Sequence, residues 1–120
     1  MILLDTHVLI WLLAGHRRAA KIPRRQRLYV SPVSLLELRF LDEIGRIKLR
    51  TDLDEISDDD RFAVDDPSTT ALFRAAAEES WTRDPFDRLI VGHARLRGFR
   101  LCTADSEIVG HLPRAAVAEV

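Results

Sequence analysis

Short apolar runs alternate along the chain with longer stretches in which apolar residues recur at helical spacing. The short runs predict strands buried on both faces, at residues 2–4, 28–30, 62–64, 100–102 and 116–118. The longer stretches predict helices, at residues 6–13, 32–44, 67–79 and 85–97. This alternation predicts a three-layer α/β/α fold around a mostly parallel sheet. A chain of 120 residues suits one core, so we expect a single domain over residues 1–120.

Two aspartates directly follow predicted strands. Asp5 ends the first apolar run, and Asp105 comes just after the fourth. Ligands of open parallel sheets bind beyond the carboxyl ends of the strands, so both residues are candidates for a shared site. Aspartate in this position also commonly caps the helix that follows. The sequence leaves the two interpretations open.

Glu37 falls within the apolar stripe of the helix predicted at 32–44. That stripe consists of Val33, Leu36, Phe40, Leu41 and Ile44. We therefore expect the Glu37 carboxylate to face the core. Burial of an unpaired carboxylate costs several kcal/mol, so Glu37 needs either a bound cation or an arginine partner.

Asp84 and Asp87 stand at the start of the last predicted helix, around Pro85. Asp84 suits the N-cap, and Asp87 suits the third helical position, where the helix dipole favours an acid. Asp87 also borders the apolar stripe of that helix, which directs its side chain towards a pocket. We interpret Asp84 mainly as a cap and Asp87 mainly as a ligand.

Carboxylates that share a pocket repel one another, by roughly 3–4 kcal/mol for each pair at about 4–5 Å and an effective dielectric constant of about 20. A hard divalent cation relieves that repulsion, and an all-oxygen ligand set suits Mg²⁺ or Mn²⁺. Such a metal activates water and stabilises the charge that develops on a phosphodiester. The candidate catalytic and metal-binding residues are Asp5, Glu37, Asp87 and Asp105.

Four sequence blocks together resemble the PIN domains of VapC-type toxins. The blocks are Met1–Trp11, Ser34–Glu37, Arg83–Ile90 and Thr103–Asp105. The resemblance implies a PIN-like fold, an endoribonuclease that depends on Mg²⁺ or Mn²⁺, a cognate antitoxin that blocks the site, and a homodimer. By motif position, it also implies that the four candidate acids hold the metal and that Asp84 has a secondary part. Gly92 and His93 depart from the small or amide residues more usual in this branch, and we expect them to alter helix packing rather than chemistry.

Several polar residues lie beside these acids in the sequence. Thr6, Ser34 and Thr103 are candidates for orienting the carboxylates, although each also suits an ordinary cap or turn. Arg88 follows Asp87 and is a candidate for holding a phosphate or for pairing with a carboxylate.

Charge is unevenly distributed, although the net charge is only −1. The charged residues from 17 to 27 are all basic, which is typical of a polyanion-binding segment or of a solvated surface. Within it we assign RNA binding to Arg24, Arg25 and Arg27. The acidic stretch 52–66 predicts a solvated loop, and residues 51–80 match no family motif.

Composition favours a soluble globular protein, with 47% apolar and 31% charged residues. No apolar run reaches the roughly 18 residues of a membrane helix, and the first residues lack the pattern of a signal peptide. One cysteine allows no internal disulfide. We therefore expect a cytoplasmic protein without a membrane partner.

Other functions compete with the nuclease interpretation. A phosphoacceptor receiver domain also gathers acids around Mg²⁺, but it needs a lysine after a late strand, and neither Lys21 nor Lys48 is so placed. A phosphatase of the DxD kind needs an acid where this chain has His7. A non-catalytic binding module, with the acids serving only as caps, is the remaining alternative; Glu37 distinguishes it, because no cap explains that residue.

Overall fold

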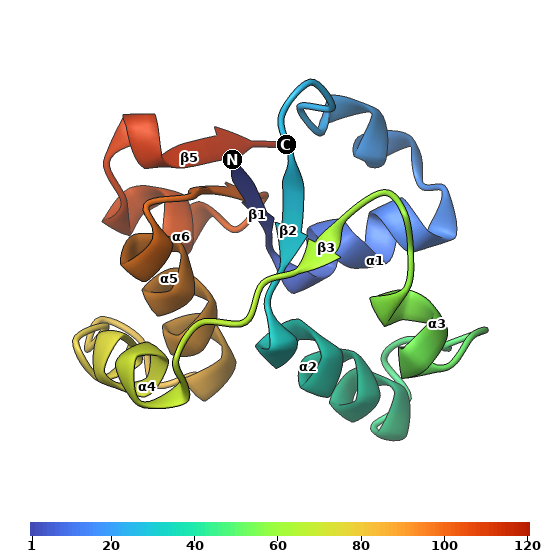
Figure 1. Ribbon diagram of the computed structural model, residues 1–120, viewed down its shortest axis with the longest axis horizontal. Helices are drawn as coiled ribbons and strands as arrows, with labels where there is room; N and C mark the ends of the chain where they lie inside the picture. The colour runs from blue at the N-terminus through green and yellow to red at the C-terminus, as the bar shows by residue number, and fades with distance from the viewer.

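The computed structural model describes residues 1–120 and contains one five-stranded sheet (Figure 1). The strands are β1 (Ile2–Leu4), β2 (Leu28–Val30), β3 (Ala63–Val64), β4 (Arg100–Thr103) and β5 (Val117–Glu119). They pair in parallel throughout, in the order β3-β2-β1-β4-β5. The predicted strands and the parallel sheet are confirmed, with boundaries shifted by about one residue.

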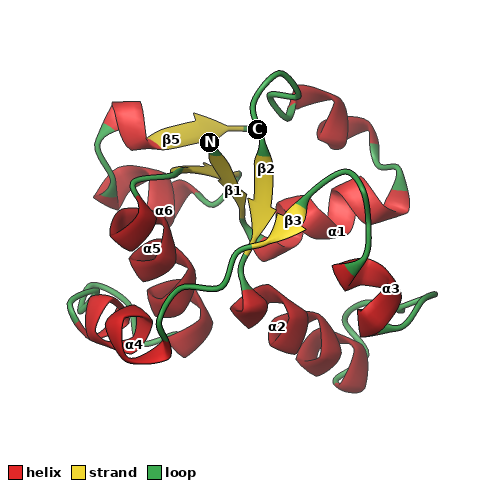
Figure 2. Cartoon of the chain, viewed as in Figure 1, coloured by secondary structure: helices red, strands yellow, loops and turns green.

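Helices fill the connections between these strands (Figure 2). They are α1 (Thr6–Ala14), α2 (Pro32–Glu43), α3 (Leu53–Ser57), α4 (Thr69–Ala77), α5 (Pro85–Arg97) and α6 (Ser106–His111), with 3₁₀ turns η1 (Arg17–Lys21) and η2 (Arg114–Ala116). The four longer helices were predicted. The sequence did not predict α3, α6 or the 3₁₀ turns, because elements of one or two turns are too short for a helical repeat of apolar residues to show. No helix has the length and apolar character that crossing a membrane requires.

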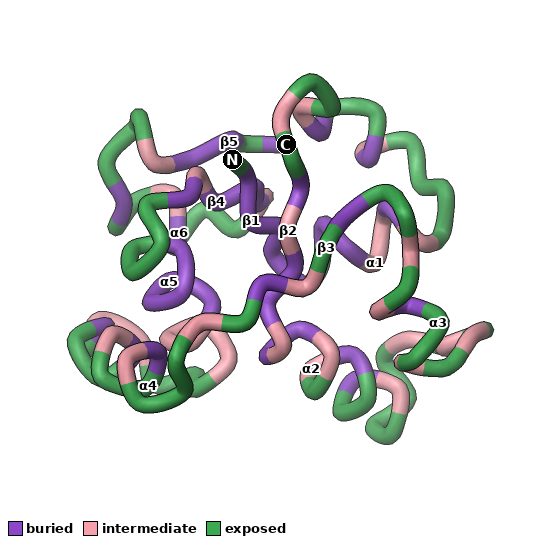
Figure 3. The backbone as a smooth tube through the Cα atoms, in the orientation of Figure 1, coloured by how far each residue is buried: buried purple, intermediate pink, exposed green.

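Two hydrophobic cores lie on opposite faces of the sheet. Ile2 and Leu4 of β1 belong to one core, and Leu3 between them belongs to the other, as the alternation of side chains along a strand requires. Figure 1 shows α1–α3 on one side of the strands and α4–α6 on the other. The buried part of the backbone is concentrated in the strands and the helix faces next to them (Figure 3). The three-layer α/β/α arrangement is thus confirmed.

The strand order creates a crevice between β1 and β4. From β1 the chain builds one half of the sheet through β2 and β3, and it then builds the other half through β4 and β5. The connections that leave β1 and β4 therefore run to opposite faces, and ligands of open parallel sheets bind at such a switch point. Asp5 and Asp105 follow these two strands, so the fold places both acids at the crevice.

Helices α4 and α5 pack with unusually close backbones at Gly92. A Cβ at this position would lie 2.8 Å from the main-chain nitrogen of Ala76, so only glycine permits the contact. The adjacent His93 is fully buried. Both residues that depart from the family pattern thus lie in helix packing.

The prediction of a solvated loop over residues 52–66 is wrong for part of this stretch. Asp52 caps α3 through the main-chain N–H of Glu55, at 2.8 Å. Asp65 is only 7% exposed and pairs with Arg97 and His93 of α5. These partners lie about 30 residues further along the chain, where a local pattern gives no sign of them.

Candidate metal centre

A pocket of about 400 Å³ opens beyond the carboxyl ends of β1 and β4. Its wall contains the five acids Asp5, Glu37, Asp84, Asp87 and Asp105, completed by His7, Trp11, Arg18 and Ala104. The acids come from four separate segments of the sequence. The structure therefore brings together all four candidate metal ligands and the secondary candidate Asp84.

Three of these acids are helix caps as well as pocket residues. Asp5, Asp84 and Asp105 are the N-caps of α1, α5 and α6, and each accepts a main-chain N–H at 2.8–2.9 Å through Oδ1. Oδ2 of Asp84 and of Asp105 makes no hydrogen bond within the protein. Capping therefore leaves the second oxygen of Asp84 and of Asp105 for the pocket, while Oδ2 of Asp5 accepts a hydrogen bond from Thr103 and keeps a second lone pair, so the two interpretations are compatible.

Glu37 and Asp87 serve no cap. Neither carboxylate takes part in any of the protein's salt bridges, which join Asp59, Asp65 and Glu79 to other residues. The arginine partner considered for Glu37 is therefore absent. Neither helix capping nor ion pairing therefore explains why Glu37 and Asp87 lie in this pocket.

The buried face of α2 differs from the predicted apolar stripe. Leu36, Phe40 and Ile44 are 62%, 44% and 50% exposed. The face that packs inward consists of Val33, Ser34, Leu38 and Leu41. Glu37 lies between the two faces and is partly buried. Apolar residues occur on more than one side of this helix, so their spacing did not determine which side packs on the sheet.

Hydroxyl groups support the acids at the crevice. Thr103 donates to Oδ2 of Asp5 at 2.8 Å and also accepts the main-chain N–H of Asp105 at 3.0 Å. Thr6 and Ser34 share a buried hydrogen bond of 2.8 Å that joins α1 to α2. All three of these predicted supporting residues thus lie beside the acids, and Thr103 contacts one of them directly.

Electrostatics in the pocket disfavours negative charge. Burial raises the pKa of Asp5 above its ordinary value, although the hydrogen bond from Thr103 opposes this. Burial likewise raises the pKa of Glu37. The pKa of Asp87 rises to about 7, through burial first and then through the negative charges of Asp84 and Asp5. These shifts are those expected of buried carboxylates that face one another and form no salt bridge.

The donor set fits a hard divalent cation. Carboxylate oxygens are the ligands that Mg²⁺ and Mn²⁺ prefer, and the pocket carboxylates have no cationic partner within salt-bridge distance. As the side chains stand, no three His, Cys, Asp or Glu residues are close enough to hold one ion. Carboxylates repel one another without a cation, and a bound cation would attract each of them.

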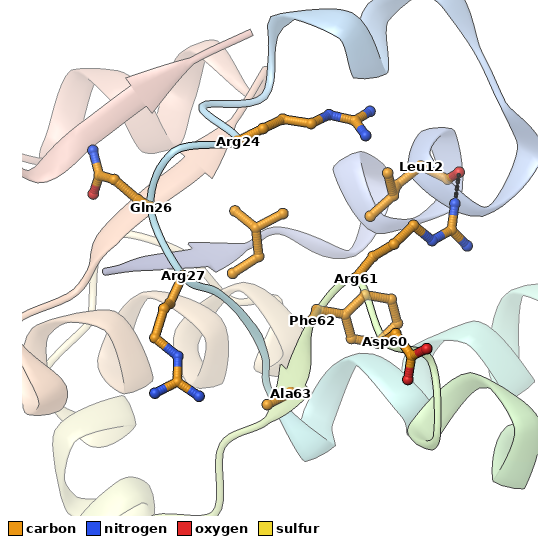
Figure 4. A pocket seen from close by; sticks show the side chains of 9 residues that line it. Leu12, Arg24, Gln26, Arg27, Asp60, Arg61, Phe62 and Ala63 are labelled. Carbon is orange, nitrogen blue, oxygen red and sulfur yellow. Dashed lines mark hydrogen bonds between the residues drawn. The ribbon is translucent and has the colours of Figure 1, made fainter.

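The arginines assigned to RNA binding lie elsewhere. Arg24 and Arg27 line a different pocket, next to Arg61, where the chain enters β2 and β3 (Figure 4). Parallel strands place this edge of the sheet at the end opposite the acids. Arg25 is exposed on the same loop. These arginines therefore lie outside the acidic pocket. Their role in RNA binding stays a prediction.

Two other basic residues contrast in their positions. Arg88 donates through Nε to the main-chain oxygen of Thr82 at 2.7 Å and does not line the acidic pocket. Arg18 does line it. The basic character of residues 17–27 was the only signal in the sequence for Arg18, and it did not distinguish this arginine from its neighbours. Lys21 and Lys48 do not line the pocket, so the lysine of a receiver domain is absent.

Comparison with known proteins agrees with this architecture. The sequence profile described as PIN domain matches residues 2–113. This chain belongs to the PIN domain family. It is 33% identical over 119 residues to Ribonuclease VapC22 of Mycobacterium tuberculosis, with 92% of this chain and 91% of that protein covered.

Solved structures share the fold of this PIN-domain chain. A toxin–antitoxin complex from Klebsiella pneumoniae superposes with a TM-score of 0.73 at 17% identity, over the whole of both chains. VapBC2 from Rickettsia felis, bound to a DNA fragment from its promoter, gives 0.66 at 18% identity over 92% of each chain. FitAcB from Neisseria gonorrhoeae gives 0.55 at 16% identity over 90% of each. At these identities the likeness shows the fold alone.

Proposed function

We propose that this PIN-domain chain is an endoribonuclease that requires Mg²⁺ or Mn²⁺. The observation that carries the proposal is the pocket of five acids, in which Glu37 and Asp87 have no ion-pair partner. Such charges destabilise the fold unless a cation binds among them. The 33% identity to Ribonuclease VapC22 supports RNA as the substrate.

The roles follow from the position of each side chain. Asp5, Glu37, Asp87 and Asp105 would hold the ion, which when bound would activate water and compensate the charge of a phosphodiester undergoing hydrolysis. Thr103 keeps Asp5 oriented by donating to its Oδ2. The Thr6–Ser34 hydrogen bond holds α1 against α2, and so fixes Glu37 relative to Asp5. Asp84 adds a further oxygen that its cap does not occupy.

Cleavage of a labelled single-stranded RNA by the purified protein tests this proposal. We expect cleavage with Mg²⁺ or Mn²⁺ and none in excess chelator, with recovery when the metal is restored. Undiminished cleavage in chelator would contradict the metal requirement. An absence of RNA cleavage under every metal condition would contradict the nuclease assignment.

We further infer that the chain is a toxin restrained by a cognate antitoxin, and that it forms a homodimer. The solved complexes that share its fold include a toxin–antitoxin complex, which supports a partner of this kind. The exposed apolar stripe Leu36, Phe40 and Ile44 supports protein association, because such a stripe is costly to leave in water. Phe40 packs near Phe86 at 5.7 Å between ring centroids, one residue from Asp87, so a partner on this stripe would reach the acidic pocket.

Co-expression tests the partner. The product of a short reading frame next to this gene should co-purify with the chain and suppress its RNA cleavage. Light scattering of the chain alone gives its oligomeric state, and a monomer at micromolar concentration would contradict the homodimer. Replacement of Phe40 with Ser should weaken binding of the co-expressed partner without changing the acids of the pocket.

A further inference from the structure

Arg18 stands apart from the other residues around the acidic pocket. It is the only lysine or arginine in the wall, opposite five carboxylates. It is partly buried, yet it forms no salt bridge with any of those acids. Its positive charge is therefore not paired with any of the carboxylates that line the same pocket.

Three contacts hold Arg18 in position. Its guanidinium carbon lies 4.3 Å from the centroid of the Trp11 ring, which is a cation–π contact. Its Nη2 donates to the main-chain oxygen of Val120 at 2.9 Å. His16 accepts the main-chain N–H of Arg18 at 3.1 Å, and its ring stacks with Trp11 at 5.6 Å. These contacts orient the guanidinium and use one of its five N–H donors.

An oriented guanidinium with unused donors matches the chemistry of a phosphate. Arginine presents a planar fork that binds phosphate oxygens through two hydrogen bonds, and it stays charged at any physiological pH. A pocket of acids repels a polyanion, and a metal ion at the cleaved bond offsets only part of that repulsion. A cation at the rim lets the rest of the nucleic-acid backbone approach.

We infer that Arg18, held against Trp11, is a phosphate-binding residue that contacts the RNA backbone beside the phosphodiester being cleaved. This inference rests on the proposed ribonuclease function. The proposed contact of Arg18 is separate from the RNA contacts assigned to Arg24, Arg25 and Arg27, which lie at the other end of the sheet. Trp11 acts as a positioning residue for the guanidinium.

RNA binding without cleavage tests the inference. Fluorescence anisotropy with a short labelled single-stranded RNA is measured in the Asp87→Asn background, so that the RNA stays intact. Arg18→Gln should raise the Kd about tenfold. It should also lower the slope of log Kd against log salt concentration by about 0.7, because one phosphate contact is lost. Arg18→Lys keeps the charge, so its slope should match that of the Asp87→Asn parent, while its Kd rises a few-fold because the two-pronged contact is lost.

Arg17→Gln is the matched control. Arg17 is the exposed neighbour of Arg18 and does not line the acidic pocket, so its removal should leave both Kd and slope unchanged. A Kd and slope for Arg18→Gln equal to those of the parent would overturn the inference. Equal losses in the Arg17 and Arg18 variants would overturn it too, because the effect would then be general surface charge. If Arg18→Gln fails to fold, Arg18→Lys decides, and an unchanged Kd for that variant overturns the inference.

The outcomes separate this inference from the proposed function. Cleavage of RNA by the natural sequence, together with normal RNA binding by Arg18→Gln, defeats only the assignment of Arg18. Absence of RNA cleavage by the natural sequence defeats the proposed function itself. Normal RNA binding by Arg18→Gln with weaker binding of the co-purified protein partner would identify Arg18 as a contact for an acidic protein segment, and would also overturn the inference.

Discussion

The two ends of α5 hold aspartates in opposite electrostatic environments. At its start, Asp87 faces other acids, and its pKa rises to about 7. Near its end, Arg97 and His93 bind Asp65 of the neighbouring loop, and the hydrogen bonds from Arg97 hold the pKa of Asp65 below its ordinary value. Asp65 has the smaller exposed fraction of the two side chains, yet it is the one that ionises more readily.

Every buried polar group of the Asp65 network has a partner. Arg97 donates to both carboxylate oxygens of Asp65, at 2.7 and 2.8 Å. Burial lowers the pKa of His93, which is therefore neutral at pH 7. An ionised Asp65 only accepts, so His93 Nε2–H donates to it, and Nδ1 accepts from the hydroxyl of Ser31, both at 2.8 Å.

The order Ser31, His93, Asp65 has the appearance of a hydrolase triad. The serine and histidine are 0% exposed and the aspartate is 7% exposed, so no substrate reaches the hydroxyl. Ser31 also caps α2 by accepting the main-chain N–H of Val33 at 3.2 Å. The network therefore joins α2, α5 and the end of β3, and its function is structural. A carboxylate with its partners in place belongs to the scaffold here, whereas the unpaired carboxylates lie at the site where we propose that a cation binds.

Removal of a pocket charge should give the largest effect on activity. Glu37→Gln and Asp87→Asn keep the size of each side chain and remove one proposed metal ligand, so RNA cleavage should fall by at least about 100-fold, equivalent to about 2.7 kcal/mol in the barrier. Metal-free stability should hold or rise, because like-charge repulsion is relieved. Added Mg²⁺ should raise the melting temperature less than it does in the parent. Cleavage rates and melting curves with and without Mg²⁺ check this.

The reverse pattern would mark these acids as scaffold. Marked destabilisation of both metal-free variants, with cleavage per folded molecule intact, would show that Glu37 and Asp87 serve structure. The contrast with Asp65 would then disappear.

Removal of the Asp65 charge should have the opposite signature. Asp65→Asn removes the charge and replaces one of the two accepting oxygens with an N–H donor that faces Arg97 or His93, which should destabilise the fold by about 2 kcal/mol. The melting temperature should fall by about 10 °C. Cleavage per folded molecule should stay within a few-fold of the parent, because Asp65 does not line the acidic pocket.

Asp66→Asn provides the control for that experiment. Asp66 is the exposed neighbour of Asp65 and makes no salt bridge, so its loss should change stability by less than about 0.5 kcal/mol. A selective loss of cleavage in folded Asp65→Asn protein would show that the network acts on the chemistry.

The acidic pocket and the Asp65 network should also differ in how stability depends on pH. This effect should be smaller than those of the substitutions above. In the metal-free protein the folded pKa of Asp87 is about 7, against an ordinary value of 3.8, so the folded state binds more protons between these pH values. This contribution lowers stability as pH rises from about 4 to 7 and is constant above that. Asp87→Asn should therefore gain stability over the parent progressively across this window, as measured by urea unfolding in chelator.

The Asp65 network contributes with the opposite sign. The folded pKa values of His93 and Asp65 both lie below their ordinary values, so the unfolded state binds more protons as pH falls. The stability from His93 is lost as pH falls below about 6.5, and that from Asp65 is lost below about 4. Below about pH 4, an Asp65→Asn variant should consequently lose less stability on further acidification than the parent, because it lacks the carboxyl group that titrates there. Parallel pH profiles for the parent and this variant would contradict the assigned ionisation.

Local patterns predicted much of the candidate site. Asp5 and Asp105 directly follow apolar runs that form strands, and Asp84 precedes a proline that begins a helix, so each position is visible within a few residues. Glu37 was selected for a stripe that proved partly exposed, and it nevertheless lies in the pocket. It reaches the pocket because it borders the inward face of α2 and is partly buried there.

Several contacts of the site and scaffold were beyond prediction because they join distant segments. Arg18 comes close to Trp11 and to Val120, and nothing in the basic run 17–27 distinguishes it from Arg24. The pairing of Asp65 with Arg97 depends on how α5 lies against the sheet.

The sequence by itself determined the strands, the longer helices and the acids at strand and helix ends, because backbone preference, apolar spacing and capping are local. Only the tertiary structure decided the strand order, which places the connections after β1 and β4 on opposite faces and opens the crevice between them. It also decided which side of α2 is buried and which carboxylates find a cationic partner. Those outcomes depend on packing between segments far apart in the chain, where small differences in burial and distance decide whether a charge is neutralised or left for a ligand.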